Sequence, residues 1–488
     1  MADWVVITAV TVGYLALTAA VGLFSGGRAS RTTEGWVAGD RALGFVVLYF
    51  IMGASIFSAF AFLGGPGWAY SRGAAAFYIL AYGVVGLVPW YFFGPRVAEL
   101  GRRHGYVTQA EFFAHRFRSP ALSAVLAVIS VVALLPYLTL QMEGAGYVFE
   151  VVTGGRIPAW AGAGLAYGVV LVYVFRSGVV GVGWTNTMQG IFMMALAWGL
   201  GLWLPHELYG GVGPMFDALA EARPELLRAP GLGPDGEPWS WGGYTSAVAI
   251  SVLGFSLWPH YFQKLFTARD TRTIKKTVVF YPTFLIFLVP ILFIGFSGVL
   301  AFPGVEPADA ILPTVVTSLD VPATMVGLFC AGALAASMST GDAILHAGAS
   351  ILVRDLWEPL AGEGPGPERE RRSIQLLVVA LGGVAYYLAI LSDASLVALL
   401  LLSYGFIAQL FPLLLAAFFW PRATPAGALA GLVAGGAVTV LFNLVPALGW
   451  ADVHPGIWGL AANVAALVAV SLATEPMEEG HVREFVVR

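Results

Sequence analysis

Two adjacent hydroxyl side chains, Ser339 and Thr340, lie in the middle of a long apolar run and could bind a hard cation. Together with Ala336 they fall at i, i+3 and i+4, which places them on one face of a helix. Hydroxyl and carbonyl oxygens are the ligands that hard cations such as sodium prefer. Hydroxyls in membrane helices also bond back to the preceding turn or allow close helix packing, so both interpretations stay open.

A second run, 44–70, could supply the remaining oxygens of such a site. It is about 27 residues long, or about 40 Å as a helix, which is more than a hydrocarbon core requires. It contains GAS at 53–55 and GGPG at 64–67. A helix break in this segment would free backbone carbonyls near Ala54 and Phe57 for a cation.

A third run, 243–263, is also interrupted by residues that weaken a helix, with Gly254, Ser256 and Pro259 in its second half. Spans interrupted by Gly or Pro at matching positions in two halves of a chain point to the binding site of a transporter. We therefore expect these two interrupted spans to contribute to a binding site.

Asp342 is an acid inside an apolar run, and its position needs a physical reason. A charged carboxylate at the centre of a membrane helix costs about 2.5–3.5 kcal/mol on insertion scales. Ser339, Asp342 and His346 follow one another at helical spacing, and this polar stripe predicts a route for an ion or a proton. In the alternative, Asp342 lies near the inner interface and is hydrated, since Arg354 follows three turns later.

Two further polar residues, Gln141 and Glu143, lie inside the run 119–148. They are two residues apart and point to different faces of a helix, so at most one faces a cavity. Gln141 is a candidate for contact with a solute, whereas Glu143 either binds the solute or joins two helices. Trp258 and Tyr404 join the candidates because each stands beside helix breakers or small residues.

The composition of the chain is that of a membrane protein. Of 488 residues, 58% are hydrophobic and 11% are charged, with a mean hydropathy of +0.80, whereas a soluble domain has about 25% charged residues. The net charge of −4 excludes a strong basic surface for nucleic acid. The single cysteine, Cys330, excludes an internal disulfide. Nucleotide-binding, zinc-protease and serine-hydrolase motifs are absent from the sequence, so we expect no enzyme.

About 20 apolar residues are needed to cross a bilayer as a helix. The sequence contains thirteen candidate runs of this kind, so we predict an all-α polytopic protein. The runs are 4–26, 44–70, 73–95, 119–148, 157–175, 182–205, 243–263, 277–302, 322–353, 373–391, 394–420, 424–446 and 454–473.

The distribution of basic residues predicts the orientation of these spans, because cytoplasmic loops collect Lys and Arg. With an external N-terminus, four of the 25 basic residues fall on the outer side, namely Arg72, Arg156, Arg223 and Arg228. The others fall on the inner side, including Arg28, Arg31 and Arg488. We therefore expect a multi-pass protein of the cell inner (plasma) membrane with a cytoplasmic C-terminus.

Several segments, in this order and spacing, resemble those of the solute:sodium symporter family, which includes carriers of proline, pantothenate, monocarboxylates and sugars. The resemblance covers nearly the whole chain. The segments are GASIFSAFAFLGGPGWAY (53–70), RRHGYVTQAEFFAHRF (102–117), FRSGVVGVGWTNTMQG (175–190), WPHYFQKLFTARD (258–270), AASMST (335–340) and GFIAQLFPLLLAAFFWPRATPAGALAG (405–431).

The resemblance implies a leucine-transporter-type fold, in which two inverted repeats of five helices are joined by flanking helices. The implied divisions are a first helix and inner loop (1–43), a first repeat (44–205), an external loop (206–242), a second repeat (243–420), two C-terminal helices (421–474) and a cytoplasmic tail (475–488).

The resemblance also implies the site residues. One sodium ion would be held by the carbonyls of Ala54, Phe57 and Ala336 and the hydroxyls of Ser339 and Thr340. The solute would lie beside it, on Ser55, Ser58, Phe255, Trp258, Tyr404 and Gln409.

Two positions depart from the family pattern and bear on the ion pathway. Many members have an acid where this chain has Asn186, and some have an acid where it has Ile56. The acid at the first position is thought to help sodium leave. Asp342 could compensate, so Asn186 and Asp342 are the predicted ion route.

We expect sodium-coupled import of a small organic solute by alternating access. The HGYVT and SLWPH elements look most like the monocarboxylate and pantothenate branches, which favours a carboxylate-bearing solute. Three alternatives are a proton-coupled carrier on the same scaffold, a proline-like amino acid as substrate, and a membrane sensor with a transporter-like body. The expected partners are the solute and the bilayer, with no nucleic acid and no obligatory protein partner evident.

Overall fold

The computed structural model describes residues 3–25, 33–358, 366–391, 396–450 and 452–486, and they are almost entirely helical. The inner-side residues Arg28, Arg31 and Arg488 lie outside the described residues. The first half contains α1 (Asp3–Ser25), α2 (Thr33–Ala38), η2 (Gly39–Arg41), α3 (Phe45–Ile56), η3 (Phe60–Gly64), α4 (Gly65–Arg72), η4 (Gly73–Phe77), α5 (Tyr78–Gly86), α6 (Pro89–His104), α7 (Gln109–Phe117), α8 (Pro120–Val152), α9 (Ala159–Tyr209), α10 (Val212–Ala222) and η5 (Pro224–Leu227). The second half contains α11 (Trp241–Phe255), α12 (Pro259–Thr267), α13 (Thr271–Leu285), α14 (Leu288–Ala301), η6 (Ala308–Ala310), α15 (Ile311–Ser318), α16 (Ala323–Ile351), η7 (Leu352–Trp357), α18 (Pro367–Leu391), α19 (Leu396–Ile407), α20 (Leu410–Phe419), α21 (Pro425–Leu444), η8 (Pro446–Leu448), α22 (Pro455–Ala473) and α23 (Glu479–Phe485).

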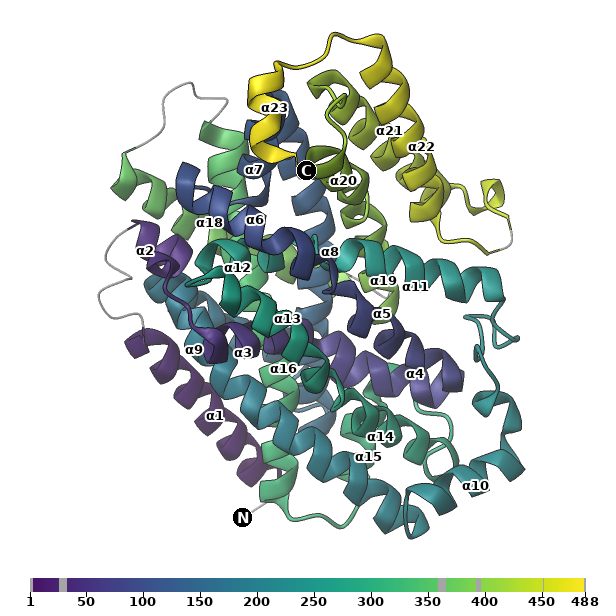
Figure 1. Ribbon diagram of the computed structural model, residues 1–488. Coiled ribbons are helices and arrows are strands. Elements are labelled where there is room, and N and C mark those ends of the chain that lie inside the picture. Colours follow the sequence, from purple (N-terminus) through teal and green to yellow (C-terminus); the bar gives the residue numbers. More distant parts are fainter. Residues whose placement is uncertain (1–2, 26–32, 359–365, 392–395, 451, 487–488) are drawn as a thin grey trace.

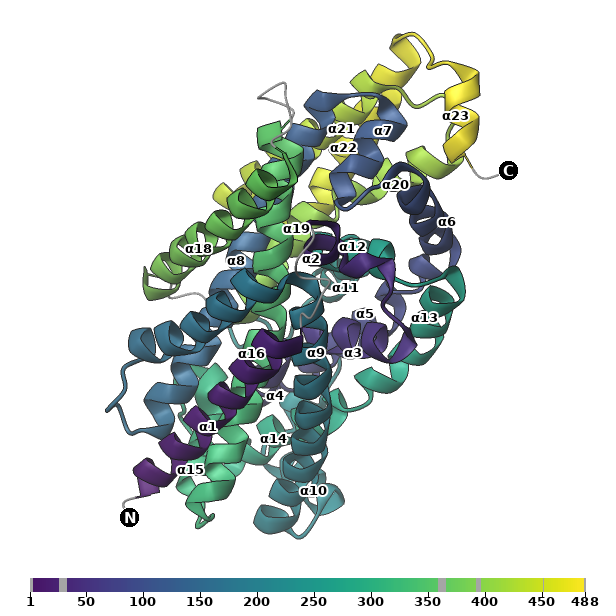
Figure 2. The same ribbon diagram turned by 90° about the vertical axis from the view of Figure 1, so that its left-hand side faces the viewer.

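The helices form one bundle with α16 at its centre. The most apolar stretch of α16 and η7 is 78% buried, and it packs against α1, α8, α9 and α3. The corresponding stretch of α18 is only 28% buried, so α18 is peripheral. The paired helices α21 and α22 lie at the edge of the bundle (Figure 1). The N- and C-terminal ends lie at opposite ends of the molecule in both views (Figures 1 and 2).

Among the described residues, nine helices are long and apolar enough to cross a membrane, and a bent pair gives a tenth. Helical segments coincide with all thirteen predicted runs, but several runs do not correspond to one straight helix each. The runs 157–175 and 182–205 are merged in the 51-residue α9, which bends at Gly178 with φ 57° and ψ −149°. Glycine takes this backbone conformation at little cost, so the chain changes direction there.

Two spans are broken where their Gly, Ser and Pro residues predict it. The first runs from α3 into η3 and α4, with a 56° bend between the two parts. Phe57 leaves the helix with φ −80° and ψ 75°. The second break separates α11 from α12, and Pro259 begins α12 without an N–H to donate.

Contacts between loops join segments that the sequence places on the same side of the membrane. On the predicted inner side, Arg41 donates to the Tyr106 carbonyl at 2.9 Å, and the Leu43 amide donates to the Thr267 carbonyl at 3.0 Å. On the predicted outer side, Arg72 donates to the Leu232 carbonyl at 2.7 Å. Each of these three contacts joins segments that the predicted alternation of spans places on one side.

The last helix, α23, packs against α6 and α7 on the predicted inner side. His104 Nε2 lies 2.8 Å from Glu484 Oε1, and His481 Nε2 lies 3.0 Å from the His115 carbonyl. Burial opposes the charge on Glu484, but the hydrogen bond and charge of His104 outweigh it and lower the pKa of Glu484. Burial and the neighbouring His104 and His481 lower the pKa of His115. Both shifts favour the docked helix at neutral pH.

Candidate functional site

The hydroxyls of Ser339 and Thr340 meet carbonyls of the first broken helix. Ser339 Oγ lies 2.9 Å from the Ala54 carbonyl oxygen and 3.1 Å from that of Ala336. Thr340 Oγ1 lies 2.9 Å from the Ser55 carbonyl oxygen. The structure thus brings four of the five predicted sodium ligands into one cluster of oxygens.

The break after α3 is what makes these carbonyls available. In an unbroken helix the Ala54 and Ser55 carbonyls would accept from the amides four residues later. Instead, the Ser58 amide donates to the Ile56 carbonyl at 2.9 Å. The Ala59 amide donates to the Gln141 side chain at 2.8 Å. The two carbonyls are therefore freed from helical pairing, and the hydroxyls of α16 donate to them.

The donor set suits a hard cation, since it contains only hydroxyl and carbonyl oxygens. Metal–oxygen distances of about 2.4 Å in octahedral geometry place neighbouring oxygens about 3.4 Å apart. The observed oxygen pairs are 2.9–3.1 Å apart, so the cluster would expand slightly around an ion. Phe57, the fifth predicted ligand, lies at the break, where its ring packs 3.8 Å from the Phe287 ring centre.

Asp342 lies at the centre of a hydrogen-bonded network between α16 and α9. Its carboxylate accepts from the Tyr173 hydroxyl at 2.6 Å, from Asn186 Nδ2 at 3.1 Å and from Thr185 Oγ1 at 3.3 Å. The side chain has 0% exposure, so the hydrated-interface alternative does not match its position. The two predicted ion-route residues, Asn186 and Asp342, are in direct contact. Tyr173 was missed, because a tyrosine in an apolar run carries no signal of its partner.

Lys264 is the second buried charge near this network. The sequence places it in the inner loop just beyond a span, but it is 2% exposed on α12. Its positive charge is close enough to attract Asp342 electrostatically. His346, one turn beyond Asp342, lies with its Nε2 3.2 Å from the Trp36 carbonyl oxygen.

Aromatic side chains from α5, α8, the second broken span and α19 form a cluster beside the oxygen cluster. The Trp258 ring centre lies 5.3 Å from that of Tyr404 and 4.7 Å from that of Tyr137. Phe255 lies 5.9 Å from Tyr82 by the same measure. Three of these, Phe255, Trp258 and Tyr404, were predicted to contact the solute.

A hydroxyl links this aromatic cluster to the oxygen cluster. Tyr261 OH donates to the Ser55 carbonyl oxygen at 3.0 Å, and it lies 3.4 Å from Tyr137 OH. The tyrosines at 82, 137 and 261 were missed by the sequence reasoning. Of these three tyrosines, only Tyr261 could have been singled out from the local sequence, because it lies two residues after Pro259, where α12 begins.

Buried polar atoms without hydrogen-bond partners lie near the same aromatic cluster. Within the described part of the chain, these include Ser55 Oγ, Ser256 Oγ and both ring nitrogens of His260. Ser58 is also fully buried. Buried polar groups are normally paired, so these atoms are suited to a polar solute that enters and leaves.

Two predicted solute contacts have other bonded partners. The Gln141 amide oxygen accepts from Ala59, and its nitrogen donates to the Tyr137 carbonyl at 3.2 Å. Gln409 Nε2 donates to the Gly405 carbonyl oxygen at 3.0 Å and to the Gly456 carbonyl oxygen at 3.1 Å. The bond to Gly456 connects the start of α20 to α22. A contact between either side chain and the solute stays a prediction.

A profile of the sodium:solute symporter family matches residues 36–435. The chain belongs to this family. The symporter is 31% identical to an uncharacterized symporter, YhjB, of Bacillus subtilis, with 95% of this chain and 96% of the relative covered. It is 25% identical to a monocarboxylate transport permease of Rhizobium johnstonii, with 89% of each chain covered. It is also 25% identical to a sodium/pantothenate symporter of Escherichia coli, with 94% of each chain covered.

Solved structures confirm the predicted fold class. A substrate-bound, outward-open structure of a Na+-coupled sialic acid symporter matches with a TM-score of 0.80, at 18% identity and with 97% of this chain and 99% of that chain covered. A structure of MhsT in complex with L-phenylalanine matches with a TM-score of 0.51, at 12% identity, covering 87% of this chain and 98% of that one. The symporter is therefore an all-α membrane transporter of the leucine-transporter type and not an enzyme.

Proposed function

We propose that this protein imports a small carboxylate-bearing solute together with sodium, by alternating access. The observation that carries the proposal is the contact between α16 and the break after α3. There, hydroxyls of Ser339 and Thr340 lie 2.9 Å from the freed carbonyls of Ala54 and Ser55. We assign the sodium ion to Ala54, Phe57, Ala336, Ser339 and Thr340.

The sodium gradient is sufficient to drive uptake. Moving one positive charge down about 100 mV yields about 2.3 kcal/mol, and a tenfold sodium gradient adds about 1.4 kcal/mol. Together these correspond to an accumulation of about 500-fold for one sodium ion per solute.

The solute would lie between the oxygen cluster and the aromatic cluster. Its apolar part would pack on Phe255, Trp258 and Tyr404, and its polar part would meet Ser55 and Ser58. The N-terminal end of α12 at Pro259 favours a negative charge. Gln141 and Gln409 complete the proposed contacts. The names of the relatives support a carboxylate, because monocarboxylates and pantothenate both carry one.

We further propose an orientation for the chain in the membrane. An external N-terminus and a cytoplasmic C-terminus in the inner (plasma) membrane follow from the basic loops. The termini at opposite ends of the bundle support an odd number of spans (Figure 1). The repeats would be 44–205 and 243–420, flanked by the helix and inner loop of 1–43, the loop 206–242, the helices of 421–474 and the tail 475–488.

A thermal-unfolding screen of the purified protein tests this proposal. Small monocarboxylates, pantothenate-like acids and amino acids including proline would be added with sodium or with potassium. We expect at least one carboxylate to raise the unfolding temperature only when sodium is present, since a ligand that binds the folded state stabilises it. Stabilisation that does not depend on sodium, with uptake that follows pH, would reject sodium coupling.

Coupling to protons is the second candidate, and the Asp342 network is the observation that favours it. A buried carboxylate held by Tyr173, Asn186 and Thr185 could take up and release a proton. In that case uptake would persist without sodium and would increase with an inward proton gradient.

A further inference from the structure

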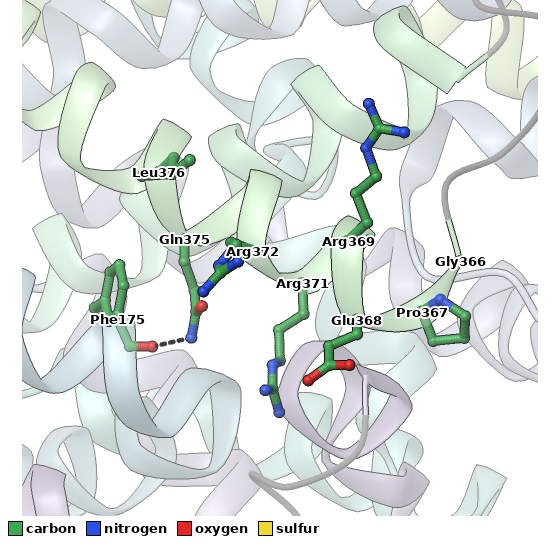
Figure 3. Close-up of a pocket in the computed structure, with 9 residues that line it drawn as sticks. All are labelled: Phe175, Gly366, Pro367, Glu368, Arg369, Arg371, Arg372, Gln375 and Leu376. Carbon is green, nitrogen blue, oxygen red and sulfur yellow. Dashed lines mark hydrogen bonds between the residues drawn. The ribbon is translucent and has the colours of Figure 1, made fainter.

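An elongated groove at the start of α18 combines arginine side chains with an apolar wall. Its first part is a cavity of about 800 Å³ between α18 and the Phe175 region of α9. Its second part, of about 890 Å³, continues along α9 and α1. The two parts share Phe175, Arg371 and Gln375. Gln375 Nε2 donates to the Phe175 carbonyl at 2.6 Å, which joins the two helices inside the groove (Figure 3).

The first part of the groove is strongly basic. Among the described residues that line the two cavities, one is acidic, Glu368, and four are arginines, namely Arg176, Arg369, Arg371 and Arg372. Figure 3 shows Arg369 and Arg371 extending in opposite directions from α18, with Arg372 beside Gln375. Planar guanidinium groups bind phosphate with two parallel hydrogen bonds, so this part of the groove suits a phosphate group.

The second part of the groove is apolar and open to the lipid side of the bundle. It is lined by Leu23, Leu171, Val172 and Val379 in addition to Arg176. Val172 is 57% exposed and Val379 is 47% exposed, although both stand in the middle of long apolar helices. Exposed aliphatic side chains on a membrane helix face acyl chains, so the groove leads from the arginines into hydrocarbon.

We propose that this groove binds an anionic diacyl phospholipid. The phosphate lies on Arg371, Arg372 and Arg176, and one acyl chain follows the apolar wall between α9 and α18. A free phosphate ion would use the basic part alone and leave the apolar part without a role. Basic pockets between membrane helices on the cytoplasmic side are typical sites for acidic lipid headgroups. The assignment to the inner leaflet rests on the orientation proposed above.

The lipid would connect two helices at a bend. Phe175 and Arg176 immediately precede the bend of α9 at Gly178. Only 28% of the apolar stretch of α18 is buried, and the lipid would supply part of its packing against α9.

Native mass spectrometry of the full-length protein tests the proposal with defined lipids. Phosphatidylglycerol, phosphatidylcholine and inorganic phosphate are added separately to the detergent-solubilised protein. The test variant replaces the three proposed phosphate ligands, as Arg176→Gln, Arg371→Gln and Arg372→Gln. A matched control removes three exposed basic charges elsewhere on the predicted inner side, as Arg269→Gln, Arg272→Gln and Arg483→Gln.

We expect the parent and the control to prefer phosphatidylglycerol over phosphatidylcholine. The test variant should lose about 100-fold in affinity, since each arginine at an anionic lipid surface contributes about 1 kcal/mol, or roughly fivefold. Equal phosphatidylglycerol binding by the test and control variants would overturn the proposal. The measurement needs neither solute nor sodium, so it can succeed even if the transport proposal fails.

A second variant tests the acyl-chain half without removing an arginine. Val379→Asp places a charge on the exposed apolar wall, where the core packing is not disturbed. It should weaken phosphatidylglycerol binding at least tenfold, because a carboxylate there costs about 2.5 kcal/mol or more against hydrocarbon. Unchanged lipid binding in this variant, or inorganic phosphate bound as tightly as the lipid, would show that the groove takes an anion alone.

Discussion

Removing the hydroxyl of Ser339 should weaken sodium binding while leaving solute binding largely intact. Ser339 Oγ lies 2.9 Å from the Ala54 carbonyl oxygen and 3.1 Å from that of Ala336, so it stands between two other proposed ligands. Alanine removes this one oxygen and keeps a high helix propensity. Thr340→Ala removes the neighbouring oxygen, which lies 2.9 Å from the Ser55 carbonyl.

The expected magnitude follows from the loss of one ligand to a charge. A hydrogen-bond-like contact to a charged group is worth about 1.5–3 kcal/mol, or roughly 10- to 150-fold in affinity. Part of this effect is offset, because each hydroxyl also bonds a carbonyl when no ion is bound. We therefore expect the sodium concentration for half-maximal uptake to rise at least about tenfold in Ser339→Ala and Thr340→Ala.

Uptake into proteoliposomes, titrated with sodium at saturating solute, measures the effect directly. Solute affinity at saturating sodium should change much less, because both hydroxyls donate to backbone carbonyls of the first broken helix. Ser350→Ala is the matched control, since its hydroxyl lies on the same helix and donates to the His346 carbonyl, one turn earlier, at 2.8 Å. If both test variants keep the parental sodium dependence, the site is wrongly placed and proton coupling becomes the better explanation.

Three further predictions concern the ion route, the orientation and the C-terminal helix. Asp342→Asn should slow transport and change its pH dependence while sodium-stimulated solute binding remains; parental kinetics between about pH 6 and pH 8 would exclude Asp342 from the route. In a Cys330→Ala background, a cysteine replacing Pro367 should react with an impermeant maleimide only from the inside, and labelling only from the outside would invert the orientation. The α23 helix should become protease-sensitive as the pH falls, because the lowered pKa values of His115 and Glu484 mean that docking is lost on protonation. His115 should act first, below its ordinary value of about 6.5, and Glu484 below about 4.3; docking that is unchanged at about pH 4 would contradict this reading.

The broken helices and the oxygen cluster were predictable because their signals are local. Gly, Ser and Pro weaken a helix through their own backbone and side-chain chemistry, so the breaks near Phe57 and Ser256 are visible in the sequence. The adjacency of Ser339 and Thr340 likewise shows which face of α16 is polar. Of their two partner carbonyls in α3, that of Ala54 follows from the family resemblance, whereas that of Ser55 was not predicted.

Contacts between distant segments were not predictable in the same way. Gln141 looks like a free amide in a span, but its oxygen pairs with the Ala59 amide that the helix break leaves open. Lys264 follows an apolar run and resembles an inner-loop lysine, but the short α12 folds it into the bundle. Sequence patterns describe the element that carries a residue, whereas burial depends on the elements packed against it.

The contact between Asn186 and Asp342 gives the departure from the family pattern a structural interpretation. The family resemblance leads one to expect an acid on α9 at position 186, but this chain has an amide there and an acid on α16. The two side chains lie 3.1 Å apart, so an acid and an amide face each other across the interface between α9 and α16. In this chain the carboxylate of the pair therefore lies on α16, about one turn from Ser339. A double exchange, Asn186→Asp with Asp342→Asn, should therefore restore more transport than Asp342→Asn alone, and no restoration would show that the carboxylate must stay on α16.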